Sequence, residues 1–111
     1  MQLKLKNNTV DLNFGIRFVK ELNKLSPVSS GDMSFGMGLT KAIPAFQAGD
    51  PEAFANILYC ATFANSPRPS YEDIEDYLDS ADVKELDKLS DEVLENLHKS
   101  SVVSRAINKM S

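Results

Sequence analysis

The side chains most often used in enzyme catalysis are scarce in this sequence, which has one histidine, His98, and one cysteine, Cys60. A catalytic thiol needs a base that holds it as a thiolate, and usually a third group that orients the base. Cys60 stands in the apolar stretch ILYCATF, whereas His98 falls near the end of a different predicted helix. We therefore predict a buried Cys60, a surface His98 favoured by the helix dipole, and no thiol-based active site.

Acidic residues and glycines, which could hold a metal ion or a phosphate group, lack the spacing that these ligands require. The acids Glu72, Asp73, Glu75, Asp76 and Asp79 are dense but have none of the glycine spacing of a calcium loop. The stretch GDMSFGMG has no GxGxxG order and no following Lys-Ser/Thr pair, so a phosphate-binding loop is not indicated. The sequence predicts no cofactor, no metal ion and no catalytic residues. We expect a protein that works by binding and is not an enzyme.

Charge is segregated along the chain, although the net charge is only −4. Eleven acidic residues lie between Tyr71 and Glu95, where only Lys84 and Lys88 are basic, whereas the first fifty residues carry six basic and four acidic groups. Phosphate contacts need concentrated Lys and Arg, so we expect no general binding to nucleic acid. The acidic stretch is typical of a solvated helix face.

The distribution of apolar residues predicts a protein that stays in the cytoplasm and away from membranes. No apolar run is long enough to span a bilayer, and Lys4 and Lys6 alternate with leucines where a secretory signal would have a basic and then an apolar segment. A single cysteine permits no intramolecular disulfide, as expected in a reducing compartment.

The first thirteen residues alternate apolar and polar side chains with the period of a half-buried strand pair. Asparagine tolerates the positive φ angles of a two-residue turn, so Asn7-Asn8 is the predicted turn. The four apolar side chains would then share one face, in the pairs Leu5–Val10 and Leu3–Leu12. A hairpin alone is marginal in water, so we expect helices to cover this face.

Helices are predicted for most of the remaining chain. The expected ranges are 14–25 with Asn13 as N-cap, 39–48 with Pro44 inside, 51–65 after an Asp50 N-cap, 70–81 with a Ser70 capping box, and 82–97. Phe14, Phe18, Leu22 and Leu25 are spaced for one face of the first helix, and 51–65, the most apolar segment, is the expected central helix. Whether 70–97 forms two helices or one bent helix, and whether the tail extends it, stays open.

These elements predict an α+β fold that is mostly α, with an N-terminal two-stranded antiparallel hairpin packed on a bundle of four to five helices. Residues 1–111 are expected to form a single domain. Its parts are the β-hairpin (1–13), the core helices (14–65) with a Gly/Ser loop (27–38), and the acidic C-terminal helices and tail (70–111).

An apolar stripe in the C-terminal part is the candidate partner-binding site. Leu86, Leu89, Val93 and Leu97 recur at helical spacing and are flanked by acids. Because the hairpin, the first helix and the central helix already supply a complete small core, the stripe is predicted to be available for a partner helix or a second copy of the chain. The acids would steer basic partner segments, an effect that salt weakens. The other interpretation, in which the stripe closes the core, stays open.

Two blocks of the sequence resemble a known family. The lysine/leucine strand, the Asn turn, the strand end LNFG and the helix start IRFVKELNK are similar to the beginning of the small phage tail assembly chaperones of siphophages that infect Gram-positive bacteria. The block SFGMGLTKAIPAFQAGDPEAFANILYCAT is similar to their middle, where a GDPEA hinge leads to an apolar helix. The resemblance covers residues 1–80 and rests on pattern, not on catalytic residues.

The resemblance implies a protein made late in infection that binds the tape measure protein, keeps its long apolar helices soluble and helps to recruit tail tube subunits. It also implies location in the host bacterial cytoplasm and absence from the mature virion. In many such phages a programmed ribosomal frameshift adds a second domain to a fraction of the copies, and this chain would be the short product.

Two interpretations from other functional classes stay open. A small acidic antitoxin-like protein or regulatory adaptor would use the acidic stretch to block a basic partner. A minor virion structural component, such as a head–tail connector, would be detected in purified virions, where a chaperone would be missing.

Overall fold

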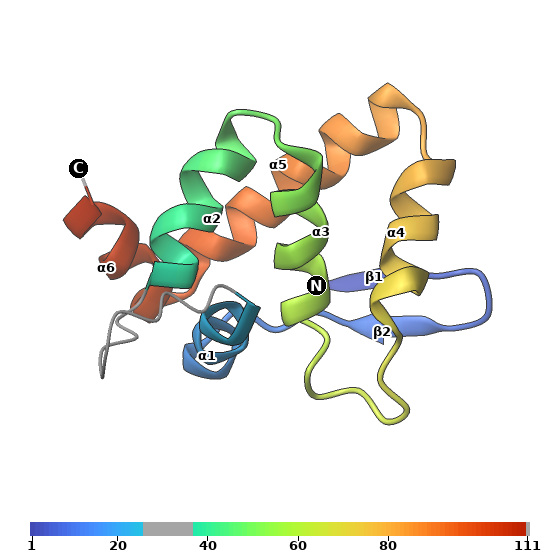
Figure 1. Ribbon diagram of the computed structural model, residues 1–111, viewed down its shortest axis with the longest axis horizontal. Coiled ribbons are helices and arrows are strands. Elements are labelled where there is room, and N and C mark those ends of the chain that lie inside the picture. The colour runs from blue at the N-terminus through green and yellow to red at the C-terminus, as the bar shows by residue number, and fades with distance from the viewer. Residues whose placement is uncertain (26–36, 111) are drawn as a thin grey trace.

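The computed structural model describes residues 1–25 and 37–110, which form a short hairpin and six helices (Figure 1). In chain order the elements are β1 (Gln2–Lys4), β2 (Thr9–Asp11), α1 (Ile16–Leu25), α2 (Met37–Gln47), α3 (Pro51–Cys60), α4 (Tyr71–Ser80), α5 (Val83–Lys99) and α6 (Ser101–Met110). The fold class is the predicted one, mostly α with a small β part. The predicted loop 27–38 lies outside the described residues except for Met37 and Gly38, which belong to α2 and not to a loop.

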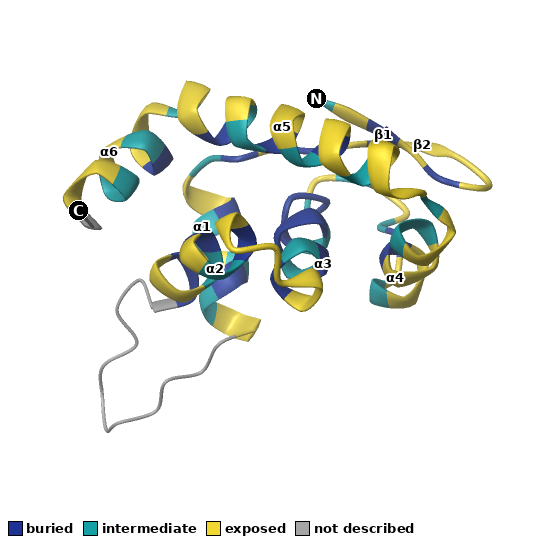
Figure 2. Cartoon of the chain, turned by 90° about the horizontal axis from the view of Figure 1, so that it is seen from above, coloured by how far each residue is buried: buried dark blue, intermediate teal, exposed yellow. Residues whose placement is uncertain are grey.

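The elements lie in two layers around one core. Helices α1 to α4 are neighbours in one layer, and α5 and the hairpin cover the other side of that layer (Figure 2). Helix α6 turns away from the end of α5 and contacts α1 and α2. The hairpin and all six helices contribute buried apolar side chains to the core, among them Phe18, Ile57, Leu58, Val93 and Val103, each fully buried.

The hairpin has the predicted apolar face but a register two residues away from the predicted one. Leu3 pairs with Val10, and the strands are joined by four residues closed by a hydrogen bond from the Leu5 N–H to the Asn8 carbonyl, 2.8 Å long. A two-residue turn would put Asn7 and Asn8 at positive φ, and no non-glycine residue among those described has a positive φ. Because side chains alternate with a period of two, the shift leaves all four apolar residues buried.

The open edge of β2 is covered by a side chain from the α3–α4 connection. The Asn65 amide accepts a hydrogen bond from the Asp11 N–H (2.9 Å) and donates one to the Asp11 carbonyl (2.8 Å), as a neighbouring strand would. The N–H of Asn13 donates to the Ala61 carbonyl at the end of α3 (2.9 Å). The hairpin is therefore fixed to the helices by polar contacts in addition to its apolar face.

Helix α1 begins at Ile16, three residues after the predicted N-cap. Asn13 is not the cap, because the first helical hydrogen bond runs from the Val19 N–H to the carbonyl of Gly15, two residues further along the chain. Phe18 and Leu22 are buried as predicted, but Leu25 at the last position is 42% exposed. The predicted apolar face therefore stops one turn before the end of the helix.

Helices α1 and α2 approach closely at Gly38. A Cβ atom added there would lie 2.5 Å from the Leu22 carbonyl carbon and 2.6 Å from the Asn23 nitrogen, both of which are backbone atoms. The Gly38 N–H also donates to the Asn23 side-chain oxygen (3.0 Å), which satisfies a free donor in the first turn of α2. This position therefore requires a residue without a side chain.

Helix α3 begins as predicted and ends five residues earlier than predicted. The Asp50 carboxylate caps it by accepting from the Glu52 N–H, with Pro51 in the first turn. At the other end the Thr62 hydroxyl donates to the Tyr59 carbonyl (2.6 Å), and the Arg68 guanidinium donates to the same oxygen (3.0 Å). These side chains occupy a carbonyl that a continuing helix would use, so the chain turns after Cys60.

The C-terminal segment forms three helices, which answers the question that the sequence left open. Ser70 and Asp73 form the predicted capping box of α4, and Asp82 and Glu85 form a second capping box that starts α5. The tail is the separate helix α6, which follows a break at Ser100. The described residues thus form one helix more than the largest number expected.

Candidate functional site

The predicted binding stripe lies on the inner side of α5. Leu89 is 7% exposed, Val93 and Leu97 are fully buried, and Leu86 is half-buried. The acids beside the stripe are exposed to solvent. Within the single chain these leucines and the valine belong to the core, so partner binding through them stays a prediction and requires that α5 leave the core.

The residues considered for catalysis and metal binding are dispersed over the described part of the chain. Cys60 is 1% exposed, and burial, followed by the charge of Glu21, raises the pKa of its thiol from 9.0 to about 12. His98 is on the surface in the last turn of α5, as predicted. Among residues 1–25 and 37–110, no group of three or more His, Cys, Asp or Glu side chains could hold a metal ion. The predicted acidic cluster is the exposed face of α4.

No helix in the described ranges is both long and apolar enough to cross a bilayer. In the same part of the chain, every buried side-chain nitrogen or oxygen atom has a hydrogen-bond partner. No unsatisfied buried side chain among the described residues is therefore aimed at a ligand.

An apolar groove lies between α1, α2 and α6, and we call it the α1–α2–α6 groove. It has a volume of about 560 Å³ and is lined by Ile16, Val19, Leu39, Thr40, Val102, Ala106 and Lys109. Its rim carries two of the large apolar side chains that the fold leaves open, Ile16 at 60% exposure and Val102 at 42%. The groove was not predicted from sequence, although Ile16 lies off the Phe14–Phe18–Leu22 face of its own helix, which is a signal readable from spacing alone.

The three helices that form the groove are basic. They carry six basic residues, namely Arg17, Lys20, Lys24, Lys41, Arg105 and Lys109, and the single acid Glu21. The acids of the chain gather instead on α4 and α5. The charge segregation seen along the sequence is thus a segregation between two regions of the folded molecule.

Comparison with known protein families agrees with a role in binding. The family model for phage tail assembly chaperone proteins (TAC) matches residues 2–111. The chain belongs to the phage tail assembly chaperone family. No curated protein and no solved structure matches it significantly.

The family match confirms the resemblance carried by the two sequence blocks and extends it over nearly the whole chain. Membership of a chaperone family supports a role in tail assembly through protein partners, without enzymatic chemistry. The narrower assignment to siphophages of Gram-positive bacteria stays a prediction.

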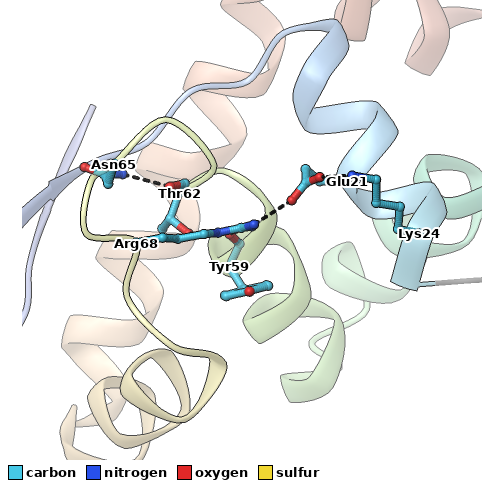
Figure 3. A network of polar contacts seen from close by, with 6 residues as sticks. All are labelled: Glu21, Lys24, Tyr59, Thr62, Asn65 and Arg68. Atoms are coloured by element: carbon cyan, nitrogen blue, oxygen red, sulfur yellow. Dashed lines mark hydrogen bonds and ion pairs between the residues drawn. The ribbon is translucent and has the colours of Figure 1, made fainter.

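In this tail assembly chaperone, α1 is fixed against the end of α3 by a polar network around Arg68 (Figure 3). The Arg68 guanidinium pairs with the Glu21 carboxylate (2.8 Å), donates to the Thr62 hydroxyl (3.2 Å) and lies 4.1 Å from the centre of the Tyr59 ring. Glu21 also accepts from Lys24 (2.8 Å). The network holds one wall of the groove in place from the opposite side of α1.

These contacts change the titration of Glu21. The hydrogen bond from Lys24, and then that from Arg68, lower the pKa of its carboxyl below the ordinary value of 4.5, although burial acts in the opposite direction. Lys24 is 74% exposed and Arg68 only 28%, so water screens the Lys24 pair more strongly. A lowered pKa in the folded state means that folding favours the ionised carboxylate.

We predict that Glu21→Gln makes the chaperone less stable at neutral pH by about 1 kcal/mol and less sensitive to acid. A carboxylate whose pKa is lowered by folding contributes fully to the stability of the protein at pH values above its pKa in the unfolded state, which is near 4.5. This contribution is lost as the pH falls through its pKa in the folded state. Urea unfolding of the unchanged protein and of the variant at about pH 7 and about pH 3.5 measures this contribution. The other carboxyl groups titrate alike in the two proteins, so the difference between them reports on Glu21. An equal fall in stability on acidification in both proteins would contradict the prediction.

Proposed function

We propose that this protein is the chaperone of its phage's tape measure protein. It binds long apolar helices of that protein, keeps them soluble and helps to recruit tail tube subunits around them. The observation that carries the proposal is the family match over residues 2–111. The apolar groove between three helices supports it, since amphipathic helices are commonly bound in such grooves.

The same proposal includes when and where the protein acts. It is made late in infection, works in the host bacterial cytoplasm and is absent from the mature virion. Self-association of the chain is part of the same proposal. Single-domain organisation of residues 1–111 is part of the proposal and is supported by one core that all the described elements share.

Coexpression with the tape measure protein from the same phage genome tests the proposed function. The soluble fraction of the tape measure protein should rise several-fold when the chain is present, and the two proteins should copurify. An unrelated acidic protein of similar size serves as the control, because it reproduces the charge without the groove. Tape measure protein that stays insoluble with both proteins would contradict the proposal.

Two further experiments, purification of the chain with its partners from infected cells and mass spectrometry of purified virions, separate the alternatives. Copurification of a small basic protein instead of a tape measure protein would identify an antitoxin-like protein or regulatory adaptor. Detection of the chain in purified virions by mass spectrometry would identify a structural or connector component.

A further inference from the structure

We propose that the α1–α2–α6 groove binds an amphipathic partner helix whose apolar stripe is flanked by acidic residues. The inference rests on the proposed function, since it specifies where a chaperone partner docks and what chemistry that partner has. It differs from the acid-flanked stripe on α5, whose apolar residues are buried.

The groove offers exposed apolar side chains from two helices far apart in sequence. Ile16 on α1 and Val102 on α6 remain 60% and 42% exposed, and Leu39 and Ala106 line the groove with them. Covering such side chains with apolar atoms removes them from water, which is favourable in proportion to the area covered. A helix with apolar residues at i, i+3, i+4 and i+7 presents a stripe of the required kind.

Charge around the groove selects which amphipathic helix binds. Lys109 lines the groove itself, and Lys20, Lys41 and Arg105 are exposed on the three helices that form it. The only acid of these helices, Glu21, is paired with Lys24 and Arg68. A helix with acidic flanks therefore meets an excess of positive charge, whereas a helix with basic flanks meets like charge.

A second copy of the chain is a poorer occupant than another protein. Its acidic helices α4 and α5 have the required charge, but the apolar stripe of α5 faces its own core, with Leu89, Val93 and Leu97 at most 7% exposed. The large apolar side chain left open on these two helices is Val83, which is 73% exposed. One such side chain does not form a stripe.

Two labelled peptides of about 18 residues, which form a helix about 27 Å long, test the inference. Both have the same leucine stripe, flanked by glutamate in one and by lysine in the other. By fluorescence anisotropy the folded chain should bind the glutamate peptide at least about tenfold more tightly, and raising the salt concentration should reduce the preference. Equal binding of both peptides, or binding of neither, would overturn the inference.

Surface variants locate the binding site. Ile16→Ser combined with Val102→Ser should weaken binding of the glutamate peptide at least about tenfold, since burying a single aliphatic side chain can raise an affinity by about this factor. Val83→Ser is the matched control, because it removes an exposed valine from α5, outside the groove. Lys109→Glu should reduce the preference for the glutamate peptide, with Lys84→Glu on α5 as its control. The inference is wrong if Val83→Ser has the same effect as the groove variant.

Failure of the inference and failure of the proposed function give different results. If the groove variant, folded by circular dichroism, still solubilises the tape measure protein, the groove is not the docking site and the proposed function stands. If the unchanged chain binds the glutamate peptide but does not solubilise the tape measure protein, the groove assignment stands and the proposed function falls. If the groove variant abolishes self-association seen by light scattering and has no effect on peptide binding, the occupant is a second copy and the inference is overturned.

Discussion

Gly38→Ala is expected to lower the free energy of unfolding by about 2–3 kcal/mol. The added methyl group would lie 2.5 Å from the carbonyl carbon of Leu22, and backbone atoms of a helix cannot move aside as a flexible side chain does. Helices α1 and α2 would have to separate, which weakens the hydrogen bond from the Gly38 N–H to Asn23 and the packing of Leu22 and Leu39. Urea denaturation followed by circular dichroism measures the change.

Gly15→Ala is the matched control for this experiment. An added Cβ at Gly15 meets no atom within 4 Å, and the φ of this glycine is not positive. The substitution should therefore change stability by no more than about 0.5 kcal/mol, or stabilise slightly by restricting the unfolded chain. If both alanine variants have the same effect, the close approach of α1 and α2 at Gly38 is wrong.

The double variant Leu89→Ser with Val93→Ser is expected to lose most of its folded structure. Each substitution removes buried apolar atoms and places a hydroxyl in the core, and large-to-small changes of this kind cost about 2–5 kcal/mol each. Their sum is comparable to the total stability of about 5–15 kcal/mol for a typical domain. Far-ultraviolet circular dichroism and thermal unfolding measure the loss.

The same variant decides between the two interpretations of the α5 stripe. Val83→Ser on the same helix is the control, and it should have little effect because Val83 is 73% exposed. A double variant that stays folded but no longer solubilises the tape measure protein would identify the stripe as the partner-binding surface predicted from sequence. Unfolding of the double variant would identify it as core.

Much of the fold could be predicted because the signals lie within a few residues of one another. The capping box of Ser70 and Asp73, the Asp50-Pro51 start of α3 and the apolar spacing of Phe18 and Leu22 each involve neighbours along one element. The apolar face of the hairpin was also predictable, because alternation alone decides which side chains share a face. The family followed from the same local patterns.

The local patterns did not predict the hairpin register or the end of α3. The hairpin register differs because a four-residue connection avoids positive φ at Asn7 and Asn8, and a shift of two residues keeps the same face, so alternation does not distinguish the two registers. The end of α3 depends on Arg68, eight residues beyond it, whose guanidinium takes the Tyr59 carbonyl.

The sequence by itself determined the type of each element up to α5, the hairpin face, the acidic character of α4 and the burial of Cys60, because each depends on periodicity, capping or local composition. Only the tertiary structure decided that the α5 stripe faces the core, that Gly38 admits no side chain, and that Ile16 and Val102 meet in one groove. Ile16 and Val102 are 86 positions apart in the chain. They lie close together because α6 packs against α1 and α2. The sequence could not predict this contact, because the periodicity of one helix carries no information about which neighbour covers it.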